Sequence, residues 1–304
     1  MNKFIFIIVC IVLSSVLCYS VERINVSVVF PSDIEAYKQA WNGYKEFFDD
    51  EETALWFSQY NLKEEESNLI YSKINKEKPD IIITFGTKTA KLAKEKITNI
   101  PVVFCMVFNA LKLSGSNMTG VSMEIPVKIK LKKIKQILPQ AKRIGLIYSD
   151  DTISRYEEIA KVCNQNELIV IGEKISSEKE LPKAIKNIFP KIDCFLMIPD
   201  SKIYFPMSVK HLLLQSLRNK IPVVGLSSKY TKAGALFSLD CDYYDLGRQS
   251  AIITMRIING EKPSDIEPLN PRKTKLSLNK FAVERLKIKI PFQILEETWE
   301  VFGE

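Results

Sequence analysis

Short apolar runs rich in isoleucine and valine alternate with amphipathic segments along most of the chain. The apolar runs predict strands, and the segments with a helical period between them predict helices. The predicted strands cover residues 24–30, 54–60, 80–85, 101–107, 143–148, 168–172, 194–198, 222–226 and 235–239. The predicted helices cover about 33–50, 67–76, 88–96, 126–138, 153–164, 178–188, 199–217 and 244–258.

This alternation predicts an α/β fold with parallel sheets. Strands that are apolar throughout are typical of a parallel sheet covered by helices on both faces. The alternation runs through two successive series, so we expect two doubly wound lobes. No tandem repeat of fixed short period is present, which argues against a solenoid.

Small polar side chains gather where the predicted strands end. Ligands of open parallel sheets bind beyond the carboxyl ends of the strands, so two lobes whose strand ends face each other would gather these groups in one cleft. The candidate ligand-binding residues, drawn from these ends and their neighbours, are Ser32, Gly86, Thr87, Lys88, Phe108, Asn109, Tyr148, Ser149, Asp200, Ser201, Ser227 and Asp240.

Two of these strand ends carry groups that suit a charged ligand. Gly86 and Thr87 join a strand to a helix, where free backbone N–H groups can hold an anion; an ordinary turn with a capping threonine is the alternative. Asp200 follows another strand and could bind a ligand ammonium, or could simply cap the next helix. Asp240 offers a second carboxylate.

The first 20 residues predict an export signal. Met1, Asn2 and Lys3 form a short basic start, and Phe4–Leu17 is almost wholly apolar. That run is shorter than the roughly 20 apolar residues needed to cross a membrane, but it suits a signal peptide cleaved after Ser20. The alternatives are a lipid anchor at Cys18 and an uncleaved membrane anchor. A periplasmic or otherwise extracytoplasmic protein is therefore expected.

Composition narrows the functional classes further. The chain has 304 residues with 46% hydrophobic and 26% charged residues, as in globular proteins. The single histidine, His211, and the lack of C-x-x-C argue against histidine-rich metal sites and zinc ribbons. Nucleotide-binding glycine motifs and G-x-S-x-G are also lacking, so we expect neither a cofactor nor an enzyme.

The net charge of +7 is spread along the chain, and nucleic-acid binding is not expected. Its one dense basic run, residues 128–135, predicts a helix with a solvated lysine face. A docking surface for an acidic partner or an anionic membrane is the alternative.

Short segments along the chain form an ordered set: PDI (79–81), GT (86–87), IPVVF (100–104), NMTGVS (117–122), LP (138–139), KRIG (142–145), PDS (199–201), IPV (221–223), DYY (242–244), LGRQ (246–249) and GEKP (260–263). In order and spacing this set resembles one group of bacterial ABC-transporter substrate-binding proteins, which includes proteins linked to tryptophan and tyrosine uptake. The resemblance covers nearly the whole chain after the leader.

The resemblance implies the type I periplasmic-binding-protein fold, with two Rossmann-like lobes joined by three hinge crossings. After the signal peptide predicted at 1–20, it implies an N-terminal lobe of 21–122 plus 244–268 and a C-terminal lobe of 123–243 plus 269–304. Family members usually carry Thr-Asp-Pro where this chain has Phe108-Asn109-Ala110, and a glycine is common where Asp240 stands.

The expected function is capture of a small polar solute, such as an amino acid, by a monomer that delivers it to an ABC permease. Thr87 and its neighbouring amides would hold a carboxylate, Asp200 or Asp240 an ammonium, and Phe108 and Tyr148 an apolar or aromatic side chain. A periplasmic sensing module that presents its ligand-bound state to a membrane signalling protein is the alternative.

Overall fold

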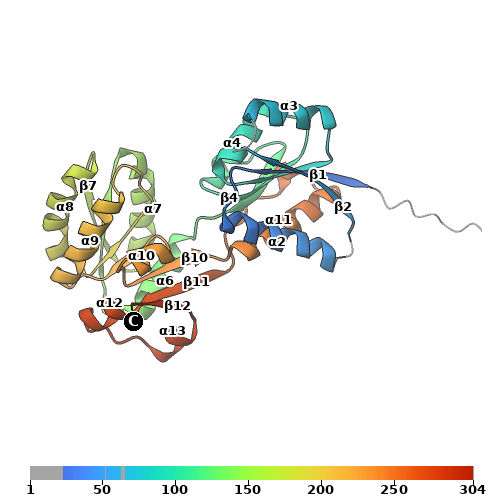
Figure 1. The fold of residues 1–304 in the computed structure, drawn as a ribbon. Helices are drawn as coiled ribbons and strands as arrows, with labels where there is room; N and C mark the ends of the chain where they lie inside the picture. Colours follow the sequence, from blue (N-terminus) through green and yellow to red (C-terminus); the bar gives the residue numbers. More distant parts are fainter. Residues whose placement is uncertain (1–22, 52, 63–65, 304) are drawn as a thin grey trace, which may run out of the picture.

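The computed structural model describes residues 23–51, 53–62 and 66–303 and folds them into two α/β lobes (Figure 1). The N-lobe is built around a five-stranded sheet and the C-lobe around a seven-stranded sheet. The two lobes with parallel sheets predicted from the sequence are therefore confirmed. The predicted signal peptide, with Cys18, lies outside the described residues.

The N-lobe sheet is wholly parallel, with the strand order β2-β1-β3-β4-β5. Its strands are β1 (Ile24–Phe30), β2 (Leu55–Asn61), β3 (Ile81–Phe85), β4 (Val102–Val107) and β5 (Met118–Ser122). Its helices are α2 (Glu35–Asp50), α3 (Ser67–Glu77), α4 (Thr87–Lys96), α5 (Ala110–Leu113) and α11 (Tyr243–Ile258).

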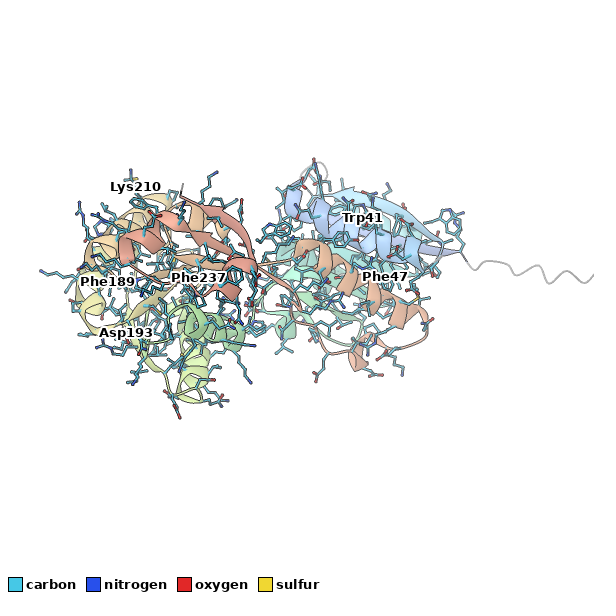
Figure 2. All side chains as sticks on the ribbon, turned by 90° about the horizontal axis from the view of Figure 1, so that it is seen from below. Trp41, Phe47, Phe189, Asp193, Lys210 and Phe237 are labelled. Atoms are coloured by element: carbon cyan, nitrogen blue, oxygen red, sulfur yellow. The ribbon has the colours of Figure 1, made fainter. Side chains whose placement is uncertain are left out.

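Helices cover both faces of this sheet because both faces are apolar. Helices α3 and α4 lie on one face, and α2 and α11 lie side by side on the other (Figure 1). Helix α2 buries Ala40, Tyr44 and Phe48, which are four residues apart and therefore share one stripe of the helix. Trp41 packs beside them in the same layer (Figure 2).

The C-lobe sheet has the order β12-β11-β10-β9-β8-β6-β7. Its strands are β6 (Arg143–Tyr148), β7 (Ile169–Lys174), β8 (Cys194–Leu196), β9 (Val223–Gly225), β10 (Phe237–Cys241), β11 (Thr274–Asn279) and β12 (Thr298–Phe302). Its α-helices are α6 (Val127–Ile137), α7 (Ile153–Asn164), α8 (Leu181–Ile188), α9 (Pro206–Asn219), α10 (Ser228–Lys232), α12 (Lys280–Leu286) and α13 (Phe292–Glu296). In the described part of the chain, no helix combines the length and apolar character needed to span a membrane.

The last two strands add an antiparallel step that the sequence pattern did not predict. β11 pairs antiparallel with β10, and β12 then pairs parallel with β11 at the edge of the sheet. The rest of the sheet is parallel, as expected.

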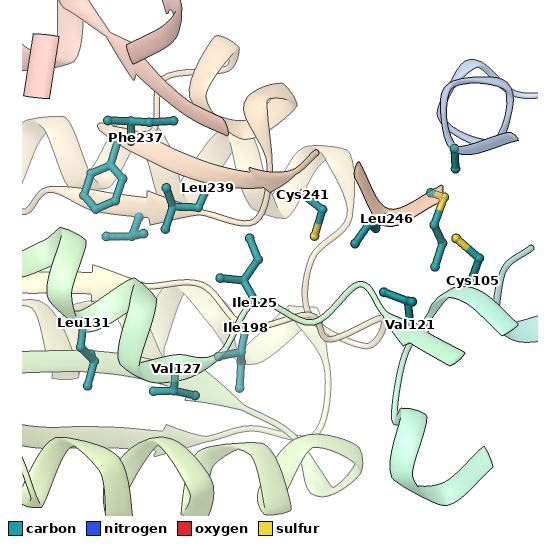
Figure 3. Packing of buried hydrophobic residues seen from close by; sticks show 14 of the residues in the cluster. Cys105, Val121, Ile125, Val127, Leu131, Ile198, Phe237, Leu239, Cys241 and Leu246 are labelled. Carbon is teal, nitrogen blue, oxygen red and sulfur yellow. The ribbon is translucent and has the colours of Figure 1, made fainter. Parts of the chain in front are cut away.

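The chain passes between the two sheets three times: after β5, after β10 and before β11. One apolar cluster continues through these crossings, with Val121 and Leu246 on the N-lobe side and Ile125 and Cys241 on the C-lobe side (Figure 3). At the third crossing, Arg272 places two nitrogens on the carboxylate of the buried Asp245, at 2.8 and 2.9 Å. This ion pair ties the crossing to α11.

Helix α9 starts later than the sequence pattern predicts. We expected a helix directly after residue 198, but the structure starts it at Pro206. Proline disfavours the helical conformation in the residue before it, and Phe205 is indeed extended, with φ −98° and ψ 162°. Residues 199–205 are therefore a loop at the carboxyl end of β8, where Asp200 lies.

Candidate ligand-binding site

A cavity of about 340 Å³ lies where the lobes meet, and both lobes line it. The N-lobe contributes Phe108, from the end of β4, and the first crossing contributes residues 123–125. The ends of β8, β9 and β10 supply the C-lobe wall, together with the inner sides of α6 and α7. Its size is within the range of about 300–1,000 Å³ that is typical of small-molecule sites.

Three of the candidates from the sequence line this cavity: Phe108, Ser227 and Asp240. The Asp240 carboxylate accepts a hydrogen bond from the Ser228 backbone N–H at 2.7 Å. Burial raises the pKa of Asp240, and the Ser228 hydrogen bonds only partly oppose this effect. Asp240 therefore presents a partly desolvated carboxylate to the cavity.

The candidates at the end of β3 hold the N-lobe wall together. Gly86 adopts φ +83°, which favours glycine, and it is the N-cap of α4. The N-cap role expected for Thr87 is wrong, since Thr87 is the first helical residue. Its hydroxyl instead accepts a hydrogen bond from the Phe108 backbone N–H at 3.0 Å, which joins the two strand ends. Lys88 is exposed on α4.

Asn109 links the N-lobe to the first crossing. It adopts a left-handed conformation with φ 55°, and its backbone N–H donates to the Glu124 carboxylate at 3.0 Å. The other oxygen of Glu124 pairs with Arg155 of α7, in the C-lobe. Glu124 therefore connects both lobes at the rim of the cavity.

Ser32 lies in a second recess, of about 370 Å³, at the carboxyl ends of β1 and β2. Its lining combines aromatic side chains, such as Tyr37, Trp41 and Tyr60, with polar and charged ones. The Tyr37 ring also approaches Gly86: a Cβ built on Gly86 would lie 2.6 Å from the Tyr37 hydroxyl oxygen. Ser32 is therefore in the N-lobe, outside the lining of the interlobe cavity.

Asp200 lies in the C-lobe, and its carboxylate accepts hydrogen bonds from other residues of that lobe. Its oxygens accept hydrogen bonds from the Ser149 N–H (3.0 Å), the Thr152 hydroxyl (2.6 Å) and the Lys202 N–H (2.9 Å). Burial by itself raises the pKa of Asp200, but these hydrogen bonds outweigh it and leave the pKa below its ordinary value. Asp200 thus ties the end of β6 to the loop after β8. Ser201, beside it, is exposed.

Tyr148 is paired within its own lobe. Its ring stacks on Tyr156 with centroids 4.3 Å apart and an interplanar angle of 10°. Both rings lie against Gly172, where a Cβ would come within 3.0 Å of each. The stack covers one face of the Tyr148 ring, and Tyr148 is outside the lining of the interlobe cavity.

Lys130, Arg155 and Tyr243 line the cavity although they were not among the candidates. Arg155 is matched by two carboxylates, those of Glu124 and Glu158. The Lys130 ammonium has no hydrogen bond or ion pair among the described residues. Burial lowers its pKa, while Cys241 and Glu158 act in the opposite direction.

Residues 23–51, 53–62 and 66–303 contain no cluster of three side chains that could hold a metal ion.

The sequence did carry a signal for Lys130. In helix α6 the buried residues Val127, Leu131 and Ile134 mark the inward face. Position 130 follows 127 by three residues and precedes 134 by four, so it shares that face. The signal was hidden because Lys130 stands in a run of lysines that otherwise predicts a solvated surface.

Comparison with known proteins gives the same overall picture. The sequence profile of a family described as "ABC transporter substrate binding protein" matches residues 23–302. A tyrosine-binding protein from Clostridioides difficile is 24% identical over 231 residues, which are 72% of this chain and 66% of that protein. The chain thus spans slightly less than two thirds of that relative's length.

Solved structures share the fold. A ligand-free, open substrate-binding protein with adhesive properties from Clostridium difficile superposes with a TM-score of 0.79 at 20% identity, covering 92% of this chain and 99% of that one. A Streptococcus pneumoniae domain solved in complex with L-Trp superposes with a TM-score of 0.65 at 19% identity, covering 92% and 100%. These likenesses establish the type I periplasmic-binding-protein fold for the chain.

Proposed function

This chain belongs to the family of ABC transporter substrate binding proteins, and we propose that it captures an aromatic amino acid outside the cytoplasmic membrane for delivery to an ABC importer. The resemblance drawn from the sequence motifs is confirmed at the level of this family. The ligand, the delivery to an importer and the extracytoplasmic location are our proposal.

One observation carries the proposal of the ligand. The interlobe cavity is lined by a carboxylate from the C-lobe, Asp240, and by an aromatic ring from the N-lobe, Phe108. Asp240 can pair with the ammonium group of an amino acid, and Phe108 can stack on an aromatic side chain. Because each lobe supplies one contact, such a ligand would favour closure of the lobes around it. Similarity to a tyrosine-binding protein and to a domain solved with L-Trp supports this choice.

Isothermal titration calorimetry with the common amino acids tests the proposal. We expect tyrosine or tryptophan to bind with a Kd of about 1 μM, which corresponds to about −8.2 kcal/mol. The variant Asp240→Asn should weaken binding about 10-fold or more, because it removes a charge-assisted contact. Asp265→Asn is the matched control, since Asp265 is exposed and lies outside the cavity lining. The proposal fails if no amino acid binds the wild-type protein.

Delivery to an importer needs its own measurement. Uptake of the radiolabelled ligand should fall in cells that lack the gene and should return when the gene is restored. Unchanged uptake together with normal ligand binding would point instead to the sensing module.

A further inference from the structure

We propose that Lys130 binds an anionic group of the ligand, so that the cavity selects solutes that carry a carboxylate. This inference rests on the proposed function, because it assigns the second charged contact of the same cavity. It differs from the sequence-based expectation, which gave the carboxylate to Thr87 and its neighbouring amides.

The position of Lys130 sets it apart from its neighbours in the basic run. Lys128, Lys132 and Lys135 are exposed, and Lys133 pairs with Glu297 at 2.5 Å. Of the lysines in this helix, only Lys130 lines the interlobe cavity. It occupies the inward face of α6, where the other side chains are apolar and buried.

The charges around Lys130 leave it without a counter-ion. Arg155 already engages Glu124 and Glu158, and within the described residues no carboxylate lies within ion-pair distance of the Lys130 ammonium. An ammonium held in such an environment is costly unless an anion compensates it. A ligand carboxylate would supply that anion, in a charge-assisted hydrogen bond.

Lys130 and Asp240 together fit a zwitterion. Both line the cavity, yet they form no ion pair with each other in the part of the chain that the structure describes. A ligand with an ammonium and a carboxylate can therefore contact both without first breaking an internal ion pair. A ligand with only one of these groups would leave one side chain unmatched.

The test uses three related probes: tyrosine, tyramine, which lacks the carboxylate, and desaminotyrosine, which lacks the ammonium. Titrations compare the wild type with Lys130→Met, which keeps an unbranched chain of similar length but no charge. Lys128→Met is the matched control, because Lys128 is exposed on the same helix. Melting temperatures verify that each variant folds.

We expect Lys130→Met to weaken tyrosine and desaminotyrosine binding by about 10- to 100-fold while tyramine binding stays unchanged. Lys128→Met should bind all probes as the wild type does, and Lys130→Arg should retain part of the affinity. The proposal is overturned if Lys130→Met weakens all three probes equally, or if it weakens none.

The two proposals fail in different ways. If the wild type binds tyrosine but Lys130→Met binds it equally well, the proposed function stands and the role of Lys130 falls. If the wild type binds none of the three probes, thermal shifts with other amino acids and simple carboxylates decide the role of Lys130. A shift in the wild type that disappears in Lys130→Met supports it, and equal shifts, or none, refute it.

Discussion

The close packing of α2 against α11 can be tested at one glycine. A Cβ built on Gly247 of α11 would lie 1.8 Å from the backbone oxygen of Ala40 in α2. Ordinary Cβ contacts start at 3.4 Å, so Gly247→Ala requires the helices to separate by roughly 1.6 Å. The obstacle is a helix backbone, which cannot turn away as a side chain can.

Two effects of Gly247→Ala oppose each other, and their sizes decide the sign. Replacing glycine by alanine inside a helix stabilises by about 1 kcal/mol. Overpacking typically costs about 1–3 kcal/mol, and a clash with backbone is at the upper end or beyond it. We expect a net loss of about 2 kcal/mol in the free energy of unfolding.

Urea unfolding followed by tryptophan fluorescence measures this change, since Trp41 is buried in α2 beside the contact. The control is Gly115→Ala, because a Cβ at Gly115 would meet no atom within 4 Å. A Gly247→Ala variant as stable as the wild type, or more stable, would refute the packing of α11 in the N-lobe. It would also undermine the path of the chain through the second crossing.

Two further predictions concern carboxylates of the C-lobe. Asp200→Ala should lower the free energy of unfolding by about 2–4 kcal/mol, because three hydrogen-bond donors lose their acceptor in a buried position. Urea unfolding measures the loss, and an unchanged stability contradicts the assigned contacts. Asp193 lies in the part of the C-lobe remote from the N-lobe (Figure 2), and hydrogen bonds from Arg143 lower its pKa to about 2 in spite of partial burial. A lowered pKa stabilises the fold above the ordinary value near 3.8, and that stabilisation is lost as the pH falls toward about 2. Because the Arg143 side chain is half exposed, we expect the Asp193 pair to contribute only about 1 kcal/mol to the free energy of unfolding. The wild type should therefore be more stable than Asp193→Asn at pH about 7, and this difference should narrow by pH about 2.5. A difference that does not change with pH contradicts the assignment.

The parallel parts of both sheets could be predicted because their strands are apolar on both faces. β3 and β4 are buried at every position, which a run of isoleucine and valine indicates directly. β12 is different, because none of its residues is buried and it lies at the edge of the sheet. Its pairing with β11 depends on contacts between distant segments, which the local pattern does not encode.

The strand-end rule led to residues that line the interlobe cavity, but it could not give their contacts. Phe108, Ser227 and Asp240 lie at the carboxyl ends of strands that border the cavity. The rule gives the position of a polar group but not its partner. Thr87 and Asp200 also follow strands, yet their polar atoms bind other groups of the protein. Which groups remain available to a ligand depends on hydrogen bonds that form only in the folded chain.

Lys130 shows how a charge pattern can conceal a side chain that lines a cavity. An amphipathic helix packed on a closed core places an apolar side chain at each inward position, because a buried ammonium is costly. A lysine at such a position is tolerated where its end reaches water or a cavity. In α6 the cavity provides that space for Lys130. Lys130 lies beside the first crossing, because it is only four residues after Pro126, the N-cap of the helix. A ligand held by Lys130 would therefore lie next to the hinge, where contacts from both lobes can reach it.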